Sequence, residues 1–479
     1  MKKFSPFLIL LGLLLWIGCE VKTPEQPSLS ITKNQLVLSK MVAIGNSLTA
    51  GFQSSGLVED FQLKSYPYLI AQQLGKAADF QMPLIAKPGI GSTAGKTPLK
   101  LQGGQIVADN LTVDPRTLLK NATLARPYDN LAVPGATLGD VLTATSSTTS
   151  ASGSNPFFDM VLRNPNFGNT SQLQQAILLN PTLIMLWIGN NDVLASALAG
   201  GNPALITSQA NFQTRFTTLL TQLRQNTRAA IVMANIPYVT DIPYVNTLDI
   251  IFRTIPALGI TSPVPVIFDT KFQPVDFDPS ANVLYIPLLT EETQVVHLTL
   301  PALSLYQTGV GVPNAAVLTS LGVPAEQAQA LEQGMKAAGL NPTGQKLPNT
   351  VSITVTENNT IKQAVDGFNS TLQTLATQFQ VPIVNANAML TTLNTSGMDG
   401  YSGKFVLLDP ANTAFSLDGV HPNNGGYALV ANAFIEKINT TFGLAIPKLN
   451  PASYKGQYTG GTISEKIALE AVEQVKAIF

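Results

Sequence analysis

Short apolar runs, each closed by a glycine, a proline or an asparagine, alternate with helical patterns along much of this 479-residue chain. Runs of this length and ending are typical of strands that are buried on both faces. They lie at Met41–Ile44, Leu183–Ile188, Ala229–Ile236 and Val381–Asn385, with a further strand end at Tyr128–Val133. Because strands that alternate with helices usually pair in parallel, the pattern predicts an α/β fold whose sheet is covered by helices on both faces.

Helices are expected between these strands, and a long irregular segment interrupts the alternation. One helix is expected to begin near Leu138, and a separate short helix to run from about Leu173 to Leu179. The other predicted helices lie at Tyr66–Leu74, Ser208–Arg224, Ile361–Phe379 and Gly426–Asn439. Between residues 238 and 360 the apolar pieces lack a steady period. A connection this long is usually functional or independently folded. We expect it to project near the carboxyl ends of the strands, either as a cap with an apolar underside or as a self-contained subdomain.

The N-terminus has the pattern of an export signal. Lys2 and Lys3 precede an apolar core at Phe7–Ile17, which is too short to span a membrane. The core ends at Gly18 and Cys19, and a small residue before a cysteine is similar to a bacterial lipobox. We therefore expect Cys19 to be acylated, in an exported lipoprotein of the cell envelope, at the bacterial outer membrane or cell surface. A plain signal peptide with an incidental cysteine and an uncleaved anchor are the alternatives.

These patterns divide the chain into regions and exclude some kinds of site. We expect a signal peptide at 1–19, a tether at 20–38, the α/β domain at 39–445 with its insertion at 238–360, and a tail at 446–479 that contains an amphipathic helix.

Cys19 is the single cysteine, so an intramolecular disulfide and a cysteine-rich metal site are excluded. Charged residues make up 12% of the chain and nearly cancel, which argues against a nucleic-acid partner.

Residues that could form a catalytic triad lie at opposite ends of the predicted domain. Ser47 follows the first strand, and the carboxyl ends of parallel strands are where ligands bind. Asp418 precedes His421 by three residues on one predicted loop, so a carboxylate could orient a base. The other histidine, His297, lies among apolar neighbours typical of a strand, with no carboxylate at useful spacing. Taken alone, Gly45-Asn46-Ser47 favours an ordinary turn over a nucleophile.

Two further segments could stabilise an oxyanion. Asn191 follows the strand at Leu183–Ile188, where its amide could donate a hydrogen bond to a developing negative charge. Gly135 follows the strand end at Tyr128–Val133, where its backbone N–H could face the same point. A helix cap at Asn191 and a simple turn at Gly135 are the structural alternatives.

Taken together, Ser47, Gly135, Asn191 and the Asp418–His421 pair resemble the conserved blocks of the SGNH/GDSL hydrolase superfamily, in the same order. The resemblance implies a three-layer α/β/α sandwich with a parallel, flavodoxin-like sheet, here with a large insertion. It also implies a triad of Ser47, Asp418 and His421, an oxyanion hole formed by Ser47, Gly135 and Asn191, and no metal or organic cofactor. Asn46 departs from the family, which has an aspartate there.

The resemblance implies a serine hydrolase that cleaves carboxylic esters, with an acyl-enzyme on Ser47. Lipid is a candidate substrate, because the anchor at Cys19 would hold the enzyme beside a membrane. A glycan O-deacetylase of the same fold is an alternative, although Trp16 and Trp187 are the only tryptophans and a sugar platform usually exposes aromatic residues. A catalytically inactive, lipid-anchored binding protein is the alternative outside the enzymes.

Overall fold

The computed structural model describes residues 36–457, except for positions 104, 152, 165, 321 and 338 and the segments 255–266, 269–273, 276–287 and 291–294. Cys19 and the helix expected in the tail therefore lie outside the described residues. Within the described part, no helix is long and apolar enough to cross a membrane.

A parallel sheet forms the centre of the molecule. Its strand order is β1 (Met41–Gly45), β6 (Leu183–Trp187), β7 (Ala230–Ala234) and β12 (Ile383–Val384). Beyond β1, the segment around Asn130 runs parallel to it, with a bridge to Ala43 and a 2.9 Å bond from Leu131 N–H to the Ala43 carbonyl. The spatial order, with the second segment outside the first, is that of flavodoxin-like sheets. The predicted fold class is therefore confirmed.

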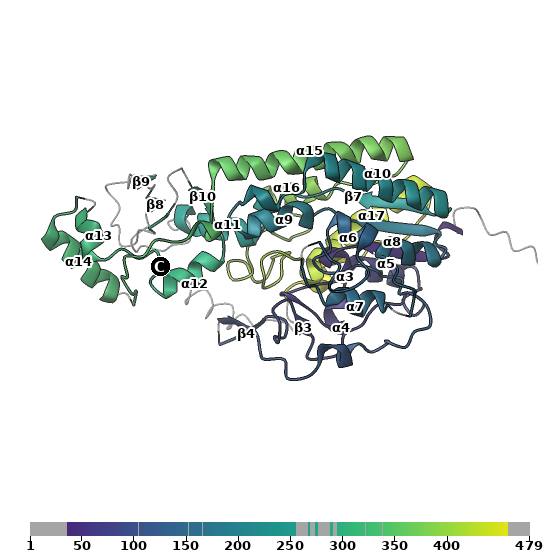
Figure 1. Ribbon diagram of the computed structural model, residues 1–479, viewed down its shortest axis with the longest axis horizontal. Helices are drawn as coiled ribbons and strands as arrows, with labels where there is room; N and C mark the ends of the chain where they lie inside the picture. The colour runs from purple at the N-terminus through teal and green to yellow at the C-terminus, as the bar shows by residue number, and fades with distance from the viewer. Residues whose placement is uncertain are drawn as a thin grey trace, which may run out of the picture.

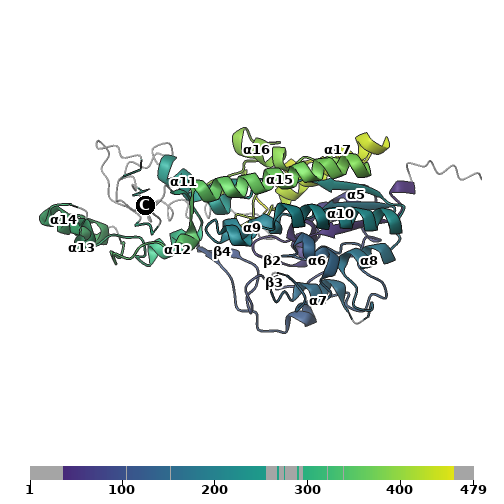
Figure 2. The same cartoon turned by 45° about the horizontal axis from the view of Figure 1, so that its top comes forward.

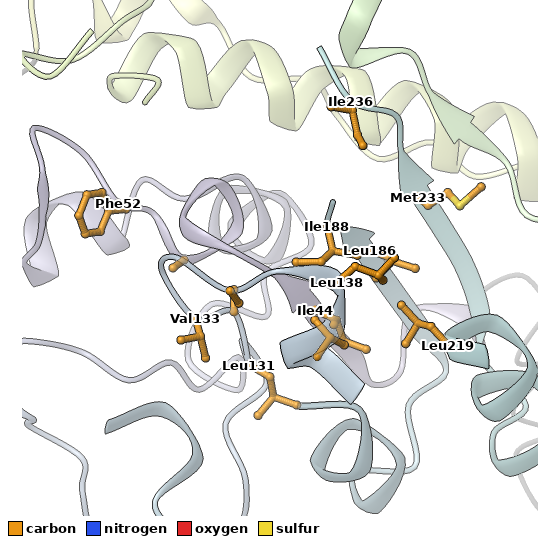
Figure 3. Packing of buried hydrophobic residues seen from close by; sticks show 14 of the residues in the cluster. Ile44, Phe52, Leu131, Val133, Leu138, Leu186, Ile188, Leu219, Met233 and Ile236 are labelled. Atoms are coloured by element: carbon orange, nitrogen blue, oxygen red, sulfur yellow. The ribbon is translucent and has the colours of Figure 1, made fainter. Parts of the chain in front are cut away.

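Helices cover both faces of the sheet, because side chains alternate along each strand. On one face lie α6 (Leu138–Thr143), α8 (Gln172–Leu178), α10 (Gln209–Asn226) and α15 (Val355–Phe379), and on the other lie α5 (Tyr66–Gln73) and α17 (Asn424–Phe442) (Figure 1). Val42 and Ile44 of β1 pack into the first layer, which Figure 3 shows in detail. Met41 and Ala43 pack into the second.

Smaller elements connect this core. Between the sheet strands lie α3 (Ser47–Ala50), β2 (Gly56–Leu57), α4 (Glu59–Gln62), β3 (Ile90–Gly91), β4 (Lys100–Gln102), β5 (Gln105–Val107), η1 (Pro115–Leu118), α7 (Phe157–Leu162), α9 (Asn191–Leu198), η2 (Pro203–Leu205) and, at the start of the insertion, η3 (Val239–Asp241). After β12 come α16 (Ala386–Thr395) and, beyond α17, η6 (Pro451–Tyr454). The described part of the predicted tail, 446–457, packs on α17, where Asn439 and Asn432 accept the backbone N–H groups of Ile446 and Leu449.

The insertion forms an arm that extends from the body, as Figures 1 and 2 both show. Its described elements are α11 (Pro243–Thr254), β8 (Ile267–Phe268), β9 (Pro274–Val275), β10 (Val295–Leu298), α12 (Pro301–Gln307), α13 (Ala315–Ser320), α14 (Ala325–Ala337), η5 (Asn349–Val351) and β11 (Ser352–Thr354). Antiparallel pairing of β10 with β11 closes the base of the arm. Its outer part buries Tyr306, Leu318 and Met335 in a cluster of its own. The outer arm thus has the packing of a small subdomain.

The helix expected at Ile361–Phe379 begins six residues earlier, at Val355. Thr354 caps it, since its hydroxyl accepts the Glu357 N–H while the Glu357 carboxylate accepts the Thr354 N–H at 2.8 Å. This capping box lies before the apolar period of the helix starts, so periodicity alone places the start too late.

Candidate active site

Ser47 follows the carboxyl end of β1, which lies between β6 and the segment around Asn130. Asn46 caps the short helix α3, and its side-chain oxygen accepts the Leu48 N–H at 3.1 Å. A side chain on Gly45 would lie 2.2 Å from the Thr49 hydroxyl and 2.6 Å from the Trp187 carbonyl, so only glycine fits. These contacts fix the turn that presents Ser47.

The structure brings Ser47, His421 and Asp418 into one hydrogen-bonded line. His421 Nε2 lies 2.9 Å from Ser47 Oγ, and His421 Nδ1 lies 2.9 Å from Asp418 Oδ2. The Phe52 ring packs against the imidazole, with 4.8 Å between ring centroids. Each ring nitrogen therefore has a partner, in the arrangement by which a base is oriented between a carboxylate and a hydroxyl.

Asp418 is buried and accepts several hydrogen bonds. Besides His421 Nδ1, its donors are the backbone N–H groups of Ser55 (2.6 Å), Val420 (2.9 Å) and His421 (2.9 Å) and the hydroxyl of Ser416 (3.1 Å). Burial alone would raise the pKa of Asp418, but the charge of His421 and the hydrogen bonds from His421 and the Ser55 N–H lower it to about 2. The carboxylate is therefore ionised at neutral pH.

Asn191 lines the same cavity as Ser47, from the first turn of α9. Its Nδ2 donates to the Ala136 carbonyl at 2.8 Å, and an amide nitrogen has a second hydrogen to offer. Gly135 lies one residue before Ala136, in a turn with φ of +81° that favours glycine. Gly135 does not line the cavity, so the Asn191–Ala136 bond is what joins its turn to the site.

Asn46 and Asp192 hold the neighbouring segments in place. Asn46 Nδ2 donates to Asn190 Oδ1 at 3.3 Å and thereby joins the loops after β1 and β6. An ionised aspartate at position 46 could not form this hydrogen bond, because it has no hydrogen to donate. Asp192 accepts the Leu138 N–H at 2.8 Å and the Thr207 hydroxyl at 2.9 Å, and thereby joins α9 to the start of α6. Burial raises the pKa of Asp192 to about 6, against the lowering effect of these bonds.

His297 lies in β10, as its apolar neighbours indicate. The expectation that it lacks a carboxylate partner is wrong, because its Nδ1 contacts Asp249 Oδ2 on α11. The two residues are 48 positions apart, so no short spacing reveals the pair. The pair joins two elements of the arm, whereas His421 contacts Ser47.

An apolar cavity opens beside the Ser47 hydroxyl. It encloses about 960 Å³, including its open mouth, and has Ser47, His421 and Asn191 among its lining residues. Most of the remaining wall is apolar, with contributions from Leu194, Val239, Ile242, Met389, Leu393 and Val430. The described residues contain no group of three or more histidine, cysteine, aspartate or glutamate side chains that could hold a metal ion.

Sequence patterns did not single out Phe52, Ser55 or Ser416, which contact the triad. The triad partners of Phe52 and Ser55 lie hundreds of positions away, as with Ser55 and Asp418 at a separation of 363 residues. The Ser416 position, two residues before Asp418, was visible only as part of the same loop.

A family model matches the part of the chain that includes the nucleophile block. Residues 41–294, more than half of the chain, match the family model of GDSL-like Lipase/Acylhydrolase. The match contains Ser47, Gly135 and Asn191 and ends before Asp418. No curated protein matches the chain. With its parallel sheet and its match over residues 41–294, the chain belongs to the GDSL-like lipase/acylhydrolase family and is a hydrolase of the SGNH type.

Proposed function

We propose that this protein hydrolyses carboxylic esters through an acyl-enzyme on Ser47. The observation that carries the proposal is the line of two 2.9 Å contacts from Ser47 Oγ through His421 to Asp418. A buried carboxylate, an imidazole and a serine hydroxyl in this order form the arrangement that activates serine for attack on a carbonyl.

In the first half of the reaction, Ser47 Oγ attacks the ester carbonyl carbon while His421 Nε2 takes the hydroxyl proton. The tetrahedral intermediate collapses, and His421 gives that proton to the departing alcohol. Water then attacks the acyl-enzyme, and the same nitrogen moves the proton of the water to Ser47 Oγ as the carboxylic acid leaves. Asp418 stays ionised throughout and stabilises the imidazolium that forms in each half.

Hydrogen-bond donors around Ser47 would stabilise the oxyanion. Ser47 is the first residue of α3, where a backbone N–H has no partner within the helix. The second hydrogen of the Asn191 amide is another donor we assign to this role, because Asn191 lines the cavity. We also assign the backbone N–H of Gly135, which does not line the cavity but lies in the turn that the Asn191–Ala136 bond joins to it. Such donors act mainly on the charge that develops in the transition state.

The cavity favours an ester with an apolar acyl chain. Its wall beyond the triad is built mainly from aliphatic and thioether side chains, and such a wall gains free energy by removing a hydrocarbon chain from water. Trp187 is buried, and its indole donates to the Asn235 carbonyl at 3.1 Å, so it is not an exposed platform for a sugar ring. This supports a lipolytic role over the deacetylation of glycans.

The proposal is tested with p-nitrophenyl esters of increasing chain length. We expect hydrolysis by the purified protein, with kcat reduced by several orders of magnitude in Ser47→Ala and in His421→Ala. His297→Ala is the matched control, because it also removes an imidazole from an aspartate but lies in the arm; its kcat should change little. Hydrolysis that survives in Ser47→Ala would show that the activity belongs to another site or mechanism.

We also propose that Cys19 carries the lipid that holds this hydrolase at a membrane of the cell envelope. The support is the sequence pattern alone, an apolar core that ends at Gly18 and Cys19. Two or more acyl chains give stable anchoring. Mass spectrometry of the native N-terminus should find an acylated Cys19, and Cys19→Ser should release the protein from membranes. An unmodified Cys19 in the membrane-bound protein would refute the proposal.

A further inference from the structure

The turn between α3 and β2 has a backbone conformation that its residues do not favour. Gln53 and Gly56 exchange two backbone hydrogen bonds, at 3.1 and 3.0 Å, so Ser54 and Ser55 form a two-residue turn. Their φ angles are +50° and +55°, in the left-handed region that such turns usually fill with asparagine and glycine. Serines in this conformation persist only where surrounding contacts hold them.

The contacts that hold this turn lead to the triad carboxylate. The Ser54 N–H donates to Ser416 Oγ at 2.9 Å, and the Ser55 N–H donates to Asp418 Oδ2 at 2.6 Å. Ser416 Oγ in turn donates to Asp418 Oδ1 at 3.1 Å. In the reverse direction, the Leu417 N–H donates to Ser54 Oγ at 3.3 Å. Ser54 and Ser416 are fully buried, so water does not compete for these bonds.

We propose that Ser416 and the Ser54–Ser55 turn form a positioning network for Asp418, an inference that rests on the proposed ester hydrolysis. Asp418 Oδ2 receives both the Ser55 N–H and His421 Nδ1. Oδ1 receives the Ser416 hydroxyl together with the backbone N–H groups of Val420 and His421. Donors on both oxygens fix the plane of the carboxylate. That plane sets the direction of the imidazole, and therefore the approach of Nε2 to Ser47.

The network also limits how strongly the negative charge of Asp418 attracts a proton bound to His421. The titratable groups that face Asp418 are His421 and, from α17, Tyr427. Burial raises the pKa of Tyr427 well above its ordinary value, and the charge of Asp418 adds to this, so the phenol stays neutral. Its hydroxyl donates to the Phe52 carbonyl at 2.9 Å. Removing the Ser416 donor would therefore leave more negative charge directed at His421.

The decisive variant is Ser416→Ala, with Ser402→Ala as its matched control. Ser402 Oγ donates to Asp409 Oδ2 at 2.6 Å, so the control removes a similar serine–aspartate bond from the same loop, away from the triad. We expect kcat of Ser416→Ala to fall about tenfold to a hundredfold with KM unchanged, as for loss of a hydrogen bond to a charged group. We also expect the acid limb of its kcat/KM profile to move to higher pH. Ser402→Ala should change neither.

Hydrogen exchange tests the Ser54–Ser55 turn directly. In the unmodified protein, the amides of Ser54 and Ser55 should exchange their hydrogens slowly, because both are bonded to buried acceptors. This measurement needs no substitution and therefore holds even if Ser416→Ala fails to fold.

The outcomes distinguish this inference from the proposed function. Ser416→Ala with unchanged kcat and pH profile would overturn the network while hydrolysis still depended on Ser47. A fall in kcat without movement of the acid limb would also overturn it, because a merely structural serine would behave in that way. Exchange of the Ser54 and Ser55 amides at the rate of an exposed loop would do the same. Hydrolysis that persists in Ser47→Ala would instead refute the proposed function.

Discussion

The two hydrogens of the Asn191 side-chain amide have different roles in the proposed mechanism. One hydrogen of Nδ2 bonds to the Ala136 carbonyl, and under the proposed mechanism the other meets the oxyanion at the edge of the cavity. The first bond is present before substrate arrives, so the donor is already oriented when charge develops. A preorganised donor of this kind stabilises the transition state more than the bound ester.

We expect Asn191→Ala to lower kcat about 10²–10³-fold with little change in KM, because the lost bond acts mainly in the transition state. Steady-state kinetics on one p-nitrophenyl ester measures both constants. Asn155→Ala is the control for loosening of the turn, since Asn155 Nδ2 donates to the Pro134 carbonyl at 2.7 Å without lining the cavity. A raised KM with kcat unchanged would show that Asn191 binds substrate instead.

At the scale of elements, the buried Asp192 joins α9 to the start of α6 and has a pKa of about 6. Between about pH 4 and pH 6 the folded protein retains a proton that this group has lost in the unfolded chain. The free energy of unfolding therefore decreases as pH rises through this window, by an amount on the order of 3 kcal/mol at most. Asp418 acts in the opposite sense, but its lowered pKa places its effect below pH 4.

Asp192→Asn should remove this dependence, because an amide keeps an acceptor for the Leu138 N–H and does not ionise. Urea unfolding of both proteins between pH 4 and pH 7 measures it. The unmodified protein should lose stability relative to the variant as pH rises, and other titrating groups cancel in the difference. If the free energy of unfolding of the two proteins changes with pH in the same way, the pKa of Asp192 in the folded protein is not raised.

The wall of the cavity is supplied largely by helices of the core, above all α16 and α17. Met389 lies on α16 and lines the cavity beyond Ser47. We expect Met389→Trp to lower kcat/KM for long-chain esters about tenfold or more while short-chain esters are unaffected, because the indole fills space that the chain needs. Thr391→Trp, on the exposed side of the same helix, is the control. An unchanged chain-length profile would place the acyl chain elsewhere.

The sequence predicts the sheet and its covering helices because their patterns are local. Each strand is a short apolar run, and a helix such as α10 begins at a side-chain cap that its own sequence contains. What could not be predicted depends on contacts between distant segments. The Ser55–Asp418 bond spans 363 residues and the Asp249–His297 pair spans 48, and neither follows from spacing. The triad itself was predictable only because its parts resemble the motifs of a family.

At the scale of the whole molecule, the insertion serves two different regions. Near its start, Val239 and Ile242 line the cavity, and the Tyr244 N–H donates to the Gly419 carbonyl at 2.8 Å, between Asp418 and His421. Farther out, α13 and α14 pack against each other at the end of the arm (Figure 1). The base of the insertion is thus part of the site, while the described outer elements do not line the cavity.

Removing the outer arm should therefore leave catalysis unchanged. The chain enters and leaves this part at adjacent positions, since the Gly344 N–H donates to the Val312 carbonyl at 2.9 Å. A linker of about three residues in place of 313–342 can join these ends, and short connections of this kind are common. We expect the shortened protein to keep the kcat/KM of the full chain across esters of every length, because the cavity wall is intact.

Ile242→Ala, at the base, should instead alter kcat/KM for the longer esters, since it enlarges the cavity. Loss of long-chain preference in a folded protein without the outer arm would show that the arm reaches the substrate and acts as a cap.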